Sequence, residues 1–322
     1  MLKWKKEGLL FNPLNISPRK KWFHGFAQAP NTLIFKKFVR VYFCCRSKPD
    51  KNGLVISYGN YVDLNRADIF EVIATGQEPI MSLGAIGTFD EFGTYPISVV
   101  KVGKRIVAYY GGWTRCESVP FNVAIGVSES FDKGKTFVRK ASGPVLGYSF
   151  DEPFVVTSPK IRIFDNTWYL FYAAGCEWFL SDGKPEIIYK IRMARSADGL
   201  KWEKLNKNLL NDKLGIREAQ ASPDVIFKNG TYHMFFCYRA GEGFRTDQTK
   251  SYRIGYATSL DLINWKREDG KVGIDVSKDG WDSQMISYPH VFELNDEIIM
   301  LYLGNEFGRH GFGVAKLEGD LI

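Results

Sequence analysis

The chain has 322 residues, of which 45% are hydrophobic and 25% are charged. This balance is typical of a soluble globular protein and excludes a disordered chain, a collagen and a small disulfide scaffold. The net charge is +7, and Lys and Arg are concentrated in residues 1–50. We interpret this excess either as a solvated basic face or as a surface that weakly attracts an anionic partner, such as a phosphorylated ligand, an acidic glycan or a membrane surface. We expect no nucleic-acid partner, because the sequence has no helical basic stripe.

The spacing of the cysteines and the hydropathy of the sequence indicate the cellular compartment of the protein. The cysteines are Cys44, Cys45, Cys116, Cys176 and Cys237, and no two form a CxxC pair. We therefore assign no metal ligands and interpret the cysteines as free thiols of a reducing compartment. No apolar run of about 18 residues predicts a membrane span, and the first residues lack the apolar core of a signal peptide. We expect a cytoplasmic protein.

A short motif centred on a proline recurs five times along the chain. Its prolines are Pro30, Pro96, Pro159, Pro223 and Pro289, spaced 66, 63, 64 and 66 residues apart. Thirteen residues after each proline an aromatic residue ends a β-like run; these are Phe43, Tyr109, Tyr172, Phe236 and Tyr302. Turn signals between proline and aromatic, such as Asn229-Gly230, predict a hairpin in several units.

Two further strands complete each unit. Segments such as 123–130, 191–198 and 254–261 predict a third strand, and Phe137, Trp202 and Trp265 mark a fourth. Five four-stranded antiparallel units at one period predict an all-β, five-bladed β-propeller with very little helix. The alternatives are an open array of repeats or two separate domains.

The last repeat ends after its third strand. Residues 3–13 resemble the fourth-strand segment at 201–210, so we expect residues 2–10 to pair into blade five and close the ring, which removes two exposed strand edges. The predicted single domain spans residues 1–322. Its blades are 24–76, 90–141, 152–206, 217–268, and 283–322 together with 2–10.

Charged and aromatic residues recur where the blades are expected to meet at the central funnel. Those before each proline are His24, Asp90, Glu91, Asp151, Glu152, Arg217, Glu218 and Asp282. Those after the second strand are Arg46, Trp113, Arg115, Glu177, Trp178, Arg239, Asn305 and Glu306. Aromatic faces with carboxylates and guanidiniums suit a polyhydroxylated ligand. The alternative is structural: turn caps, local ion pairs, loop-packing aromatics and a satisfied histidine.

Long polar segments follow the second strands of blades three and four. Residues 176–188 and 240–251 contain glycines and charged residues, and loops of this kind on one face of a scaffold commonly line a site. The alternatives are a lid and an ordinary mobile loop.

The proline-led strand starts, the YLFY second strand and the SADGLKW segment at 196–202 resemble the five-bladed glycoside hydrolases of families 32, 43, 62, 68 and 130. The resemblance covers the whole chain and implies this fold and action on a carbohydrate. It also implies carboxylates at three positions, which here hold Ala29, Ser158 and Ala221. The chain therefore departs from the usual catalytic set of families 32 and 43.

Glycoside hydrolysis needs a protonated acid and a second carboxylate at a defined separation, with their pKa values held apart. We predict Glu218 as the acid, because it lies on the expected blade, and Asp90 and Asp282 as candidate bases. The predicted substrate-binding residues are His24, Arg46, Trp113, Glu152, Glu177, Arg217, Arg239 and Asn305.

Three functions remain open on this evidence. The first is a divergent glycoside hydrolase-like enzyme that acts on an oligosaccharide or glycoconjugate. The second is a cytoplasmic glycan-biosynthesis enzyme that uses an activated sugar, such as a nucleotide sugar, and the third is a non-catalytic sugar-binding propeller. We expect no required cofactor. An axial calcium ion is implied by the resemblance alone, since the sequence shows no cage of acidic ligands.

Overall fold

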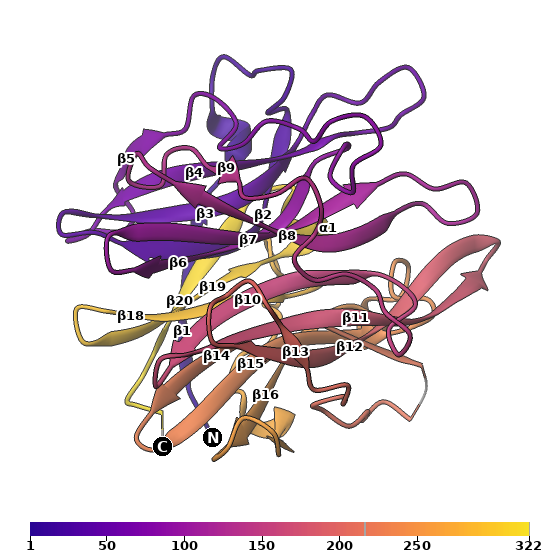
Figure 1. The fold of residues 1–322 in the computed structure, drawn as a ribbon. Coiled ribbons are helices and arrows are strands. Elements are labelled where there is room, and N and C mark those ends of the chain that lie inside the picture. The colour runs from indigo at the N-terminus through magenta and orange to yellow at the C-terminus, as the bar shows by residue number, and fades with distance from the viewer. Residues whose placement is uncertain (216, 322) are drawn as a thin grey trace.

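The strands of this protein form five four-stranded antiparallel sheets that surround a central axis (Figure 1). The computed structural model describes residues 1–215 and 217–321. The prediction of an all-β, five-bladed propeller is confirmed. In the described residues the helical segments are short, namely η1 (Pro13–Asn15), η2 (Gln248–Lys250), η3 (Asp269–Lys271) and α1 (Asn305–Gly308). No helix among them is long and apolar enough to cross a bilayer.

Each blade runs from an inner strand at the axis to an outer strand. Blade one is β2 (Gly25–Ile34), β3 (Phe38–Arg46), β4 (Ser57–Asn65) and β5 (Val72–Thr75). Blade two is β6 (Thr94–Val102), β7 (Arg105–Thr114), β8 (Asn122–Ser130) and β9 (Val138–Arg139). Blade three is β10 (Val156–Phe164), β11 (Thr167–Ser181), β12 (Lys184–Ser196) and β13 (Glu203–Lys204). Blade four is β14 (Glu218–Lys228), β15 (Thr231–Ala240), β16 (Arg253–Ser259) and β17 (Lys266–Arg267). Blade five is β18 (Ser287–Leu294), β19 (Glu297–Leu303), β20 (Phe312–Leu317) and the N-terminal β1 (Trp4–Phe11).

The N-terminal strand closes the ring, as the sequence predicted. Strand β1 pairs antiparallel with β20, so that Trp4 lies opposite Leu317, and the Glu318 backbone N–H donates to Lys3 O at 2.8 Å. The Trp4 ring also packs edge-on against Phe235 of blade four, with 5.5 Å between ring centroids. One short strand therefore completes blade five and joins it to its neighbour.

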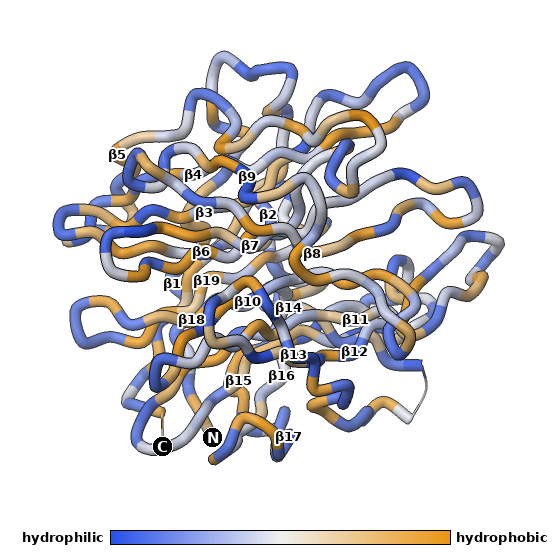
Figure 2. Tube along the Cα trace, in the orientation of Figure 1, coloured by the Kyte–Doolittle hydropathy of each residue, from blue (hydrophilic) through white to orange (hydrophobic). Residues whose placement is uncertain are grey.

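Apolar side chains of neighbouring blades pack against each other in shared clusters. Figure 2 shows hydrophilic positions on many of the projecting loops. The recurring aromatics Phe43, Tyr109, Tyr172, Phe236 and Tyr302 are all buried. The repeat therefore records the core positions of the blades, since each aromatic must fill the same space in its own unit.

Hydrogen bonds connect each inner strand to the next blade. The pairs are Val99 N–H to Asn31, Ile161 N–H to Ser98, Arg162 to Val225 O, Val291 N–H to Asp224 and Thr32 N–H to His290. They form a continuous circle through all five blades. Because these groups are largely buried, each bond prevents an unpaired polar group near the axis.

Tyrosines of second strands connect neighbouring blades farther from the axis. The Tyr42 hydroxyl donates to Gly134 O at 2.8 Å, and the Tyr109 hydroxyl donates to Gly199 O at 2.6 Å. Both acceptors lie in the turn between the third and fourth strands of the following blade. The SADG segment at 196–199 and the corresponding turn at 130–134 thus provide docking points between blades.

Candidate functional site

A cavity of about 430 Å³ lies at the mouth of the central axis. All five blades contribute to its walls, which are formed by Gln28, Arg46, Val55, Ser57, Tyr95, Trp113, Pro120, Phe121, Val123, Thr157, Ser158, Trp178, Pro185, Glu186, Ile187, Tyr189, Ala221, Arg239, Phe244, Arg245, Tyr252, Tyr288 and Phe307. Its volume falls in the range of small-molecule sites, roughly 300–1,000 Å³.

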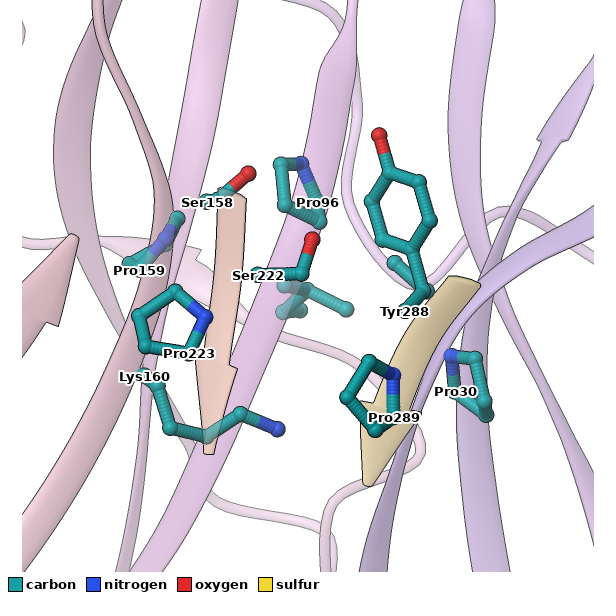
Figure 3. Close-up of a pocket in the computed structure, with 11 residues that line it drawn as sticks. Pro30, Pro96, Ser158, Pro159, Lys160, Ser222, Pro223, Tyr288 and Pro289 are labelled. Carbon is teal, nitrogen blue, oxygen red and sulfur yellow. The ribbon is translucent and has the colours of Figure 1, made fainter. Parts of the chain in front are cut away.

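The recurring prolines shape the floor of this cavity. Each inner strand has a register shift at its proline. The preceding residue has a positive φ in four blades, at Ala29, Ser158, Ser222 and Tyr288. In Figure 3 the prolines surround the axis and the hydroxyls of Ser158, Ser222 and Tyr288 point to one side. Ser158 and Tyr288 also line the cavity, so this bulge turns pre-proline side chains toward it.

Aromatic side chains form one wall. Trp178 packs edge-on against Phe121 with 5.5 Å between ring centroids, and the Trp113 indole N–H donates to Ser57. Trp178 comes from the segment 176–188, which the sequence predicted as a loop. The structure corrects this, because β11 and β12 continue as paired strands past a bulge at Gly175 and Glu177, with Trp178 opposite Ile187. Paired backbone gives these side chains a more rigid support than a loop.

The second long segment, 240–251, lies against this hairpin. Arg245 forms a two-point ion pair with Glu186, with distances of 2.7 Å from Nε to Oε1 and 3.3 Å from Nη2 to Oε2. Phe244 is buried and its ring lies 3.6 Å from the Arg239 guanidinium carbon. The segment is thus joined to blade three and contributes two side chains to the cavity.

Two further arginines face the cavity without a carboxylate partner among the described residues. Arg239 is 3% exposed, and its guanidinium donates to the carbonyls of Ala240 and Ile187 and to the Tyr252 hydroxyl. Half-buried Arg46 donates from Nε to the Gln28 side chain at 3.2 Å and stacks on the Phe26 ring. Burial lowers the pKa of Arg46, and the charge of Arg245 lowers it further.

The sequence-predicted carboxylates Asp90 and Asp282 lie inside their own blades and not in the cavity lining. Asp90 is fully buried and accepts from Tyr110 Oη at 3.0 Å and from Arg139 Nε at 2.6 Å. Asp282 is 3% exposed and accepts from Tyr302 Oη at 3.0 Å and from Lys6 Nζ at 2.7 Å. In both cases the cation belongs to the outermost strand of the same blade.

Glu152 and Glu218 follow the same plan in blades three and four. Glu152 accepts from Tyr172 Oη at 2.8 Å and forms an ion pair with Lys204. Glu218 forms an ion pair with Arg267, whose guanidinium carbon lies 4.7 Å from the Tyr238 ring centroid. Asp90, Glu152 and Asp282 thus each hold the outer strand of a blade to the second strand, whereas Glu218 binds the outer strand through Arg267. The expectation that these four acids converge at the funnel is corrected.

The electrostatics of Glu218 oppose its predicted role as a general acid. Burial alone would raise the pKa of this carboxyl, but the hydrogen bond from Arg267 and the backbone N–H of Lys213 outweigh burial and hold the pKa below its usual value. A general acid needs a raised pKa so that it keeps its proton at neutral pH. The geometry favours a structural role for Glu218.

The remaining predicted residues divide between the cavity and its surroundings. Arg46, Trp113 and Arg239 line the cavity, as expected. Arg217 is exposed and forms ion pairs with Glu177 at 2.9 Å and with Glu242 at 3.0 Å, outside the lining.

His24 and Asn305 also lie outside the cavity lining. His24 is exposed. Asn305 accepts from the backbone N–H of Gln284 and donates to Gly280 O, so it holds a loop of blade five.

Several cavity residues carry no repeat signature. They are Glu186, Tyr189, Phe244, Arg245 and Tyr252. All belong to, or directly flank, the two long segments that follow the second strands of blades three and four. The loop-length signal was therefore the one that could have found them.

A buried polar cluster lies beneath the cavity. A narrow axial space of about 20 Å³, close to the volume of one water probe, is lined by the five prolines and Lys160 (Figure 3). Lys160 Nζ lies 3.3 Å from Asp224 Oδ2, and Asp224 also accepts from His290 Nδ1 at 2.7 Å. Burial lowers the pKa of Lys160 to about 8, despite the attraction of Asp224.

This channel does not fit the calcium ion that the resemblance implied. Calcium takes six to eight oxygen ligands, whereas the axial space is lined by the Lys160 side chain, and the neighbouring Asp224 carboxylate is already bound by Lys160 and Arg162. Within the described residues, no group of three or more His, Cys, Asp or Glu side chains could hold a metal ion.

Comparison with known proteins gives the family. Two uncharacterized proteins of Mycobacterium tuberculosis, Rv1502 and MT1551, are each 33% identical to the chain over 316 residues, which is 98% of this chain and 99% of each relative. The chain belongs to their family. No established family model matches it.

Solved structures of low identity share the fold of this family member. A putative glycoside hydrolase from Parabacteroides distasonis has a TM-score of 0.73 at 14% identity and covers 100% of this chain and 98% of its own. A structure described as a glycoside hydrolase has a TM-score of 0.75 at 13% identity, covering 98% and 92%. A structure from the GH130 family, described as glycoside hydrolases that target β-1,2 mannosidic linkages in Candida mannan, has a TM-score of 0.70 at 12% identity, covering 98% and 93%. The resemblance to five-bladed glycoside hydrolases is thus confirmed for the fold.

Proposed function

We propose that the protein binds a carbohydrate in the axial cavity, and that it does so without cleaving a glycosidic bond through a pair of carboxylic acids. Binding is supported by the presence of both aromatic and polar side chains in one concave cavity. The indoles of Trp113 and Trp178 line the cavity, and the polar side chains of Gln28 and Thr157 line it as well. Sugars present apolar ring faces and a periphery of hydroxyls, which suits this combination.

The charge of the cavity argues against hydrolysis by two carboxyl groups. That mechanism needs an acid and a second carboxylate about 5–9.5 Å apart. Glu186 is the one carboxylate among the described residues that line the cavity, and Arg245 holds it in an ion pair. The predicted acids Asp90, Glu218 and Asp282 are buried in the blades. The site therefore suits binding or transfer of a sugar better than it suits hydrolysis of a glycosidic bond.

The fold neighbours add independent support for a carbohydrate ligand, since several are described as glycoside hydrolases. The cytoplasmic location stays a prediction. It is supported by the five cysteines, which are all free in the described structure, as expected of a reducing compartment.

The test is calorimetric titration of the protein with a panel of mono- and oligosaccharides. We expect at least one sugar to bind, and Trp178→Ala to weaken its binding at least tenfold, because stacking on an aromatic face contributes much of the contact. The matched control is Trp22→Ala, which removes an indole stacked on Phe23 outside the cavity. Equal losses in both variants, or no binding by any sugar, would contradict the proposal. Release of reducing sugar at an enzymatic rate would contradict its second part.

A further inference from the structure

The cavity carries an excess of positive charge. Its lining contains three guanidiniums, Arg46, Arg239 and Arg245, and one carboxylate, Glu186, so the net formal charge is 3 − 1 = +2. Glu186 is fully engaged with Arg245. Two positive charges therefore face the cavity with no carboxylate to balance them among the described residues.

Among the described residues, Arg40 is a buried guanidinium whose charge is balanced differently from that of Arg239. Arg40 is buried to the same degree as Arg239, at 2% and 3% exposure. Arg40 forms a two-point ion pair with Asp63, with both distances 2.7 Å. Arg239 is held by backbone carbonyls and a tyrosine hydroxyl, which orient it but leave its charge unbalanced. Burying an unbalanced charge costs free energy that a bound anion would offset.

Arg46 has the geometry to receive such an anion. Its Nε donates to Gln28, and Phe26 stacks on the plane of the guanidinium at 4.2 Å. Both contacts fix the plane, yet no protein acceptor is assigned to the two Nη groups among the described residues. A guanidinium held in this way presents two parallel N–H donors, the arrangement that matches the oxygens of a carboxylate or phosphate.

We propose that the sugar bound in this cavity carries an oxyanion, a carboxylate or a phosphate, and that Arg46 binds it through its Nη groups while Arg239 adds its charge from blade four. This inference rests on the proposed function, since it specifies the ligand of the same site. A sugar acid and a phosphorylated or nucleotide-linked sugar share the required chemistry.

The experiment compares matched ligands by calorimetric titration of the full-length protein. The pairs are glucose with glucuronate, galactose with galacturonate, and mannose with mannose 1-phosphate, and UDP-glucose and GDP-mannose extend the phosphate arm. We expect an anionic member to bind at least tenfold more tightly than its neutral partner. This preference should shrink on raising NaCl from 50 to 300 mM, because salt screens the attraction. The carboxylate and phosphate arms identify the source of the oxyanion.

Arg46→Gln tests the residue, and Arg66→Gln is its matched control. Arg66 bonds to Asn295 and to Phe35 O outside the cavity and likewise forms no ion pair with any residue that the structure describes. We expect Arg46→Gln to reduce the anion preference at least tenfold, Arg46→Lys to restore part of it, and Arg66→Gln to leave it unchanged. Thermal unfolding of each variant checks that it is folded.

The outcomes separate the two proposals. Equal affinity for neutral and anionic partners, or a preference that survives Arg46→Gln, overturns the oxyanion inference and leaves carbohydrate binding intact. Failure of every sugar to bind overturns the proposed function itself.

Discussion

The Tyr172 hydroxyl donates a hydrogen bond of 2.8 Å to the Glu152 carboxylate, which lies twenty residues earlier in the chain. The same spacing joins Asp90 to Tyr110 and Asp282 to Tyr302. In each blade a cation from the outermost strand completes the group, namely Lys204, Arg139 and Lys6. The acids that mark the start of these repeats therefore hold the four strands of a blade together.

Substitution of such an acid should reduce stability and not ligand binding. We expect Asp282→Asn to lower the free energy of unfolding by about 3 kcal/mol, because it leaves Lys6 partly buried without its counter-charge. Urea denaturation followed by tryptophan fluorescence measures this. The control is Asp279→Asn at a nearby exposed carboxylate. If Asp282→Asn kept its stability and lost sugar binding, Asp282 would have a role in the binding site and the structural assignment would be wrong.

The closing strand makes a second prediction. Trp4 is 7% exposed and packs on Phe235, so Trp4→Ala should cost about 3–5 kcal/mol of unfolding free energy, as expected for a buried aromatic. Lys5→Ala changes the neighbouring exposed residue of the same strand and should have little effect. Chemical denaturation of both variants tests the contribution of β1. Equal stabilities would mean that ring closure depends on the backbone pairing alone.

Stability should fall in mildly acidic solution because of His290. Thr32 N–H donates to Nε2, and Asp224 lies 2.7 Å from Nδ1, so the ring is held neutral with its proton on Nδ1. Burial, together with the charge of Lys160, lowers the pKa of His290 to about 4. In the unfolded chain the pKa of this histidine is about 6.5, so as pH falls the unfolded chain binds the proton before the folded protein does. Stability is therefore full above pH 6.5 and is lost between about 6.5 and 4.

The size and specificity of this effect can be measured. For a shift of this size the loss of unfolding free energy is about 3 kcal/mol, and buried His233, whose pKa burial also lowers, adds an effect of the same sign. Urea denaturation between pH 4.5 and 7.5 gives the slope of the unfolding free energy against pH. His24→Gln, at an exposed histidine, should leave the slope unchanged. A flat profile, or one that rises toward acid, would contradict a neutral His290.

Charge balance in the cavity yields a prediction for Glu186. Glu186→Gln removes the negative charge that neutralises Arg245, so affinity for an anionic sugar should increase severalfold while affinity for its neutral partner stays the same. Titration of both ligands measures the difference. Glu242→Gln is the control, because this exposed carboxylate pairs with Arg217 outside the cavity. Weaker anion binding by Glu186→Gln would instead show that Glu186 positions Arg245 for the ligand.

The sequence alone determined the architecture of this protein. The period set by Pro30, Pro96 and their counterparts is a property of the core, because every blade must fill the same space with the same kind of side chain. The missing fourth strand of the last repeat likewise required a partner, and Trp4–Phe11 supplied it. These inferences depend on local residue patterns and on strand pairing, and both can be recognised from the order of residues in the sequence.

Only the tertiary structure decided the site. Side chains of a strand alternate between its faces, and a one-residue bulge reverses the alternation. The register shift at each proline therefore turns Ser158 and Tyr288 to the cavity. Glu152 and Asp282 precede the inner strands of their blades and are buried by contacts that no alternation predicts. Arg245 and Glu186 meet because an extended hairpin of blade three reaches a segment of blade four. No spacing in the sequence records that contact, since it depends on the relative placement of two blades.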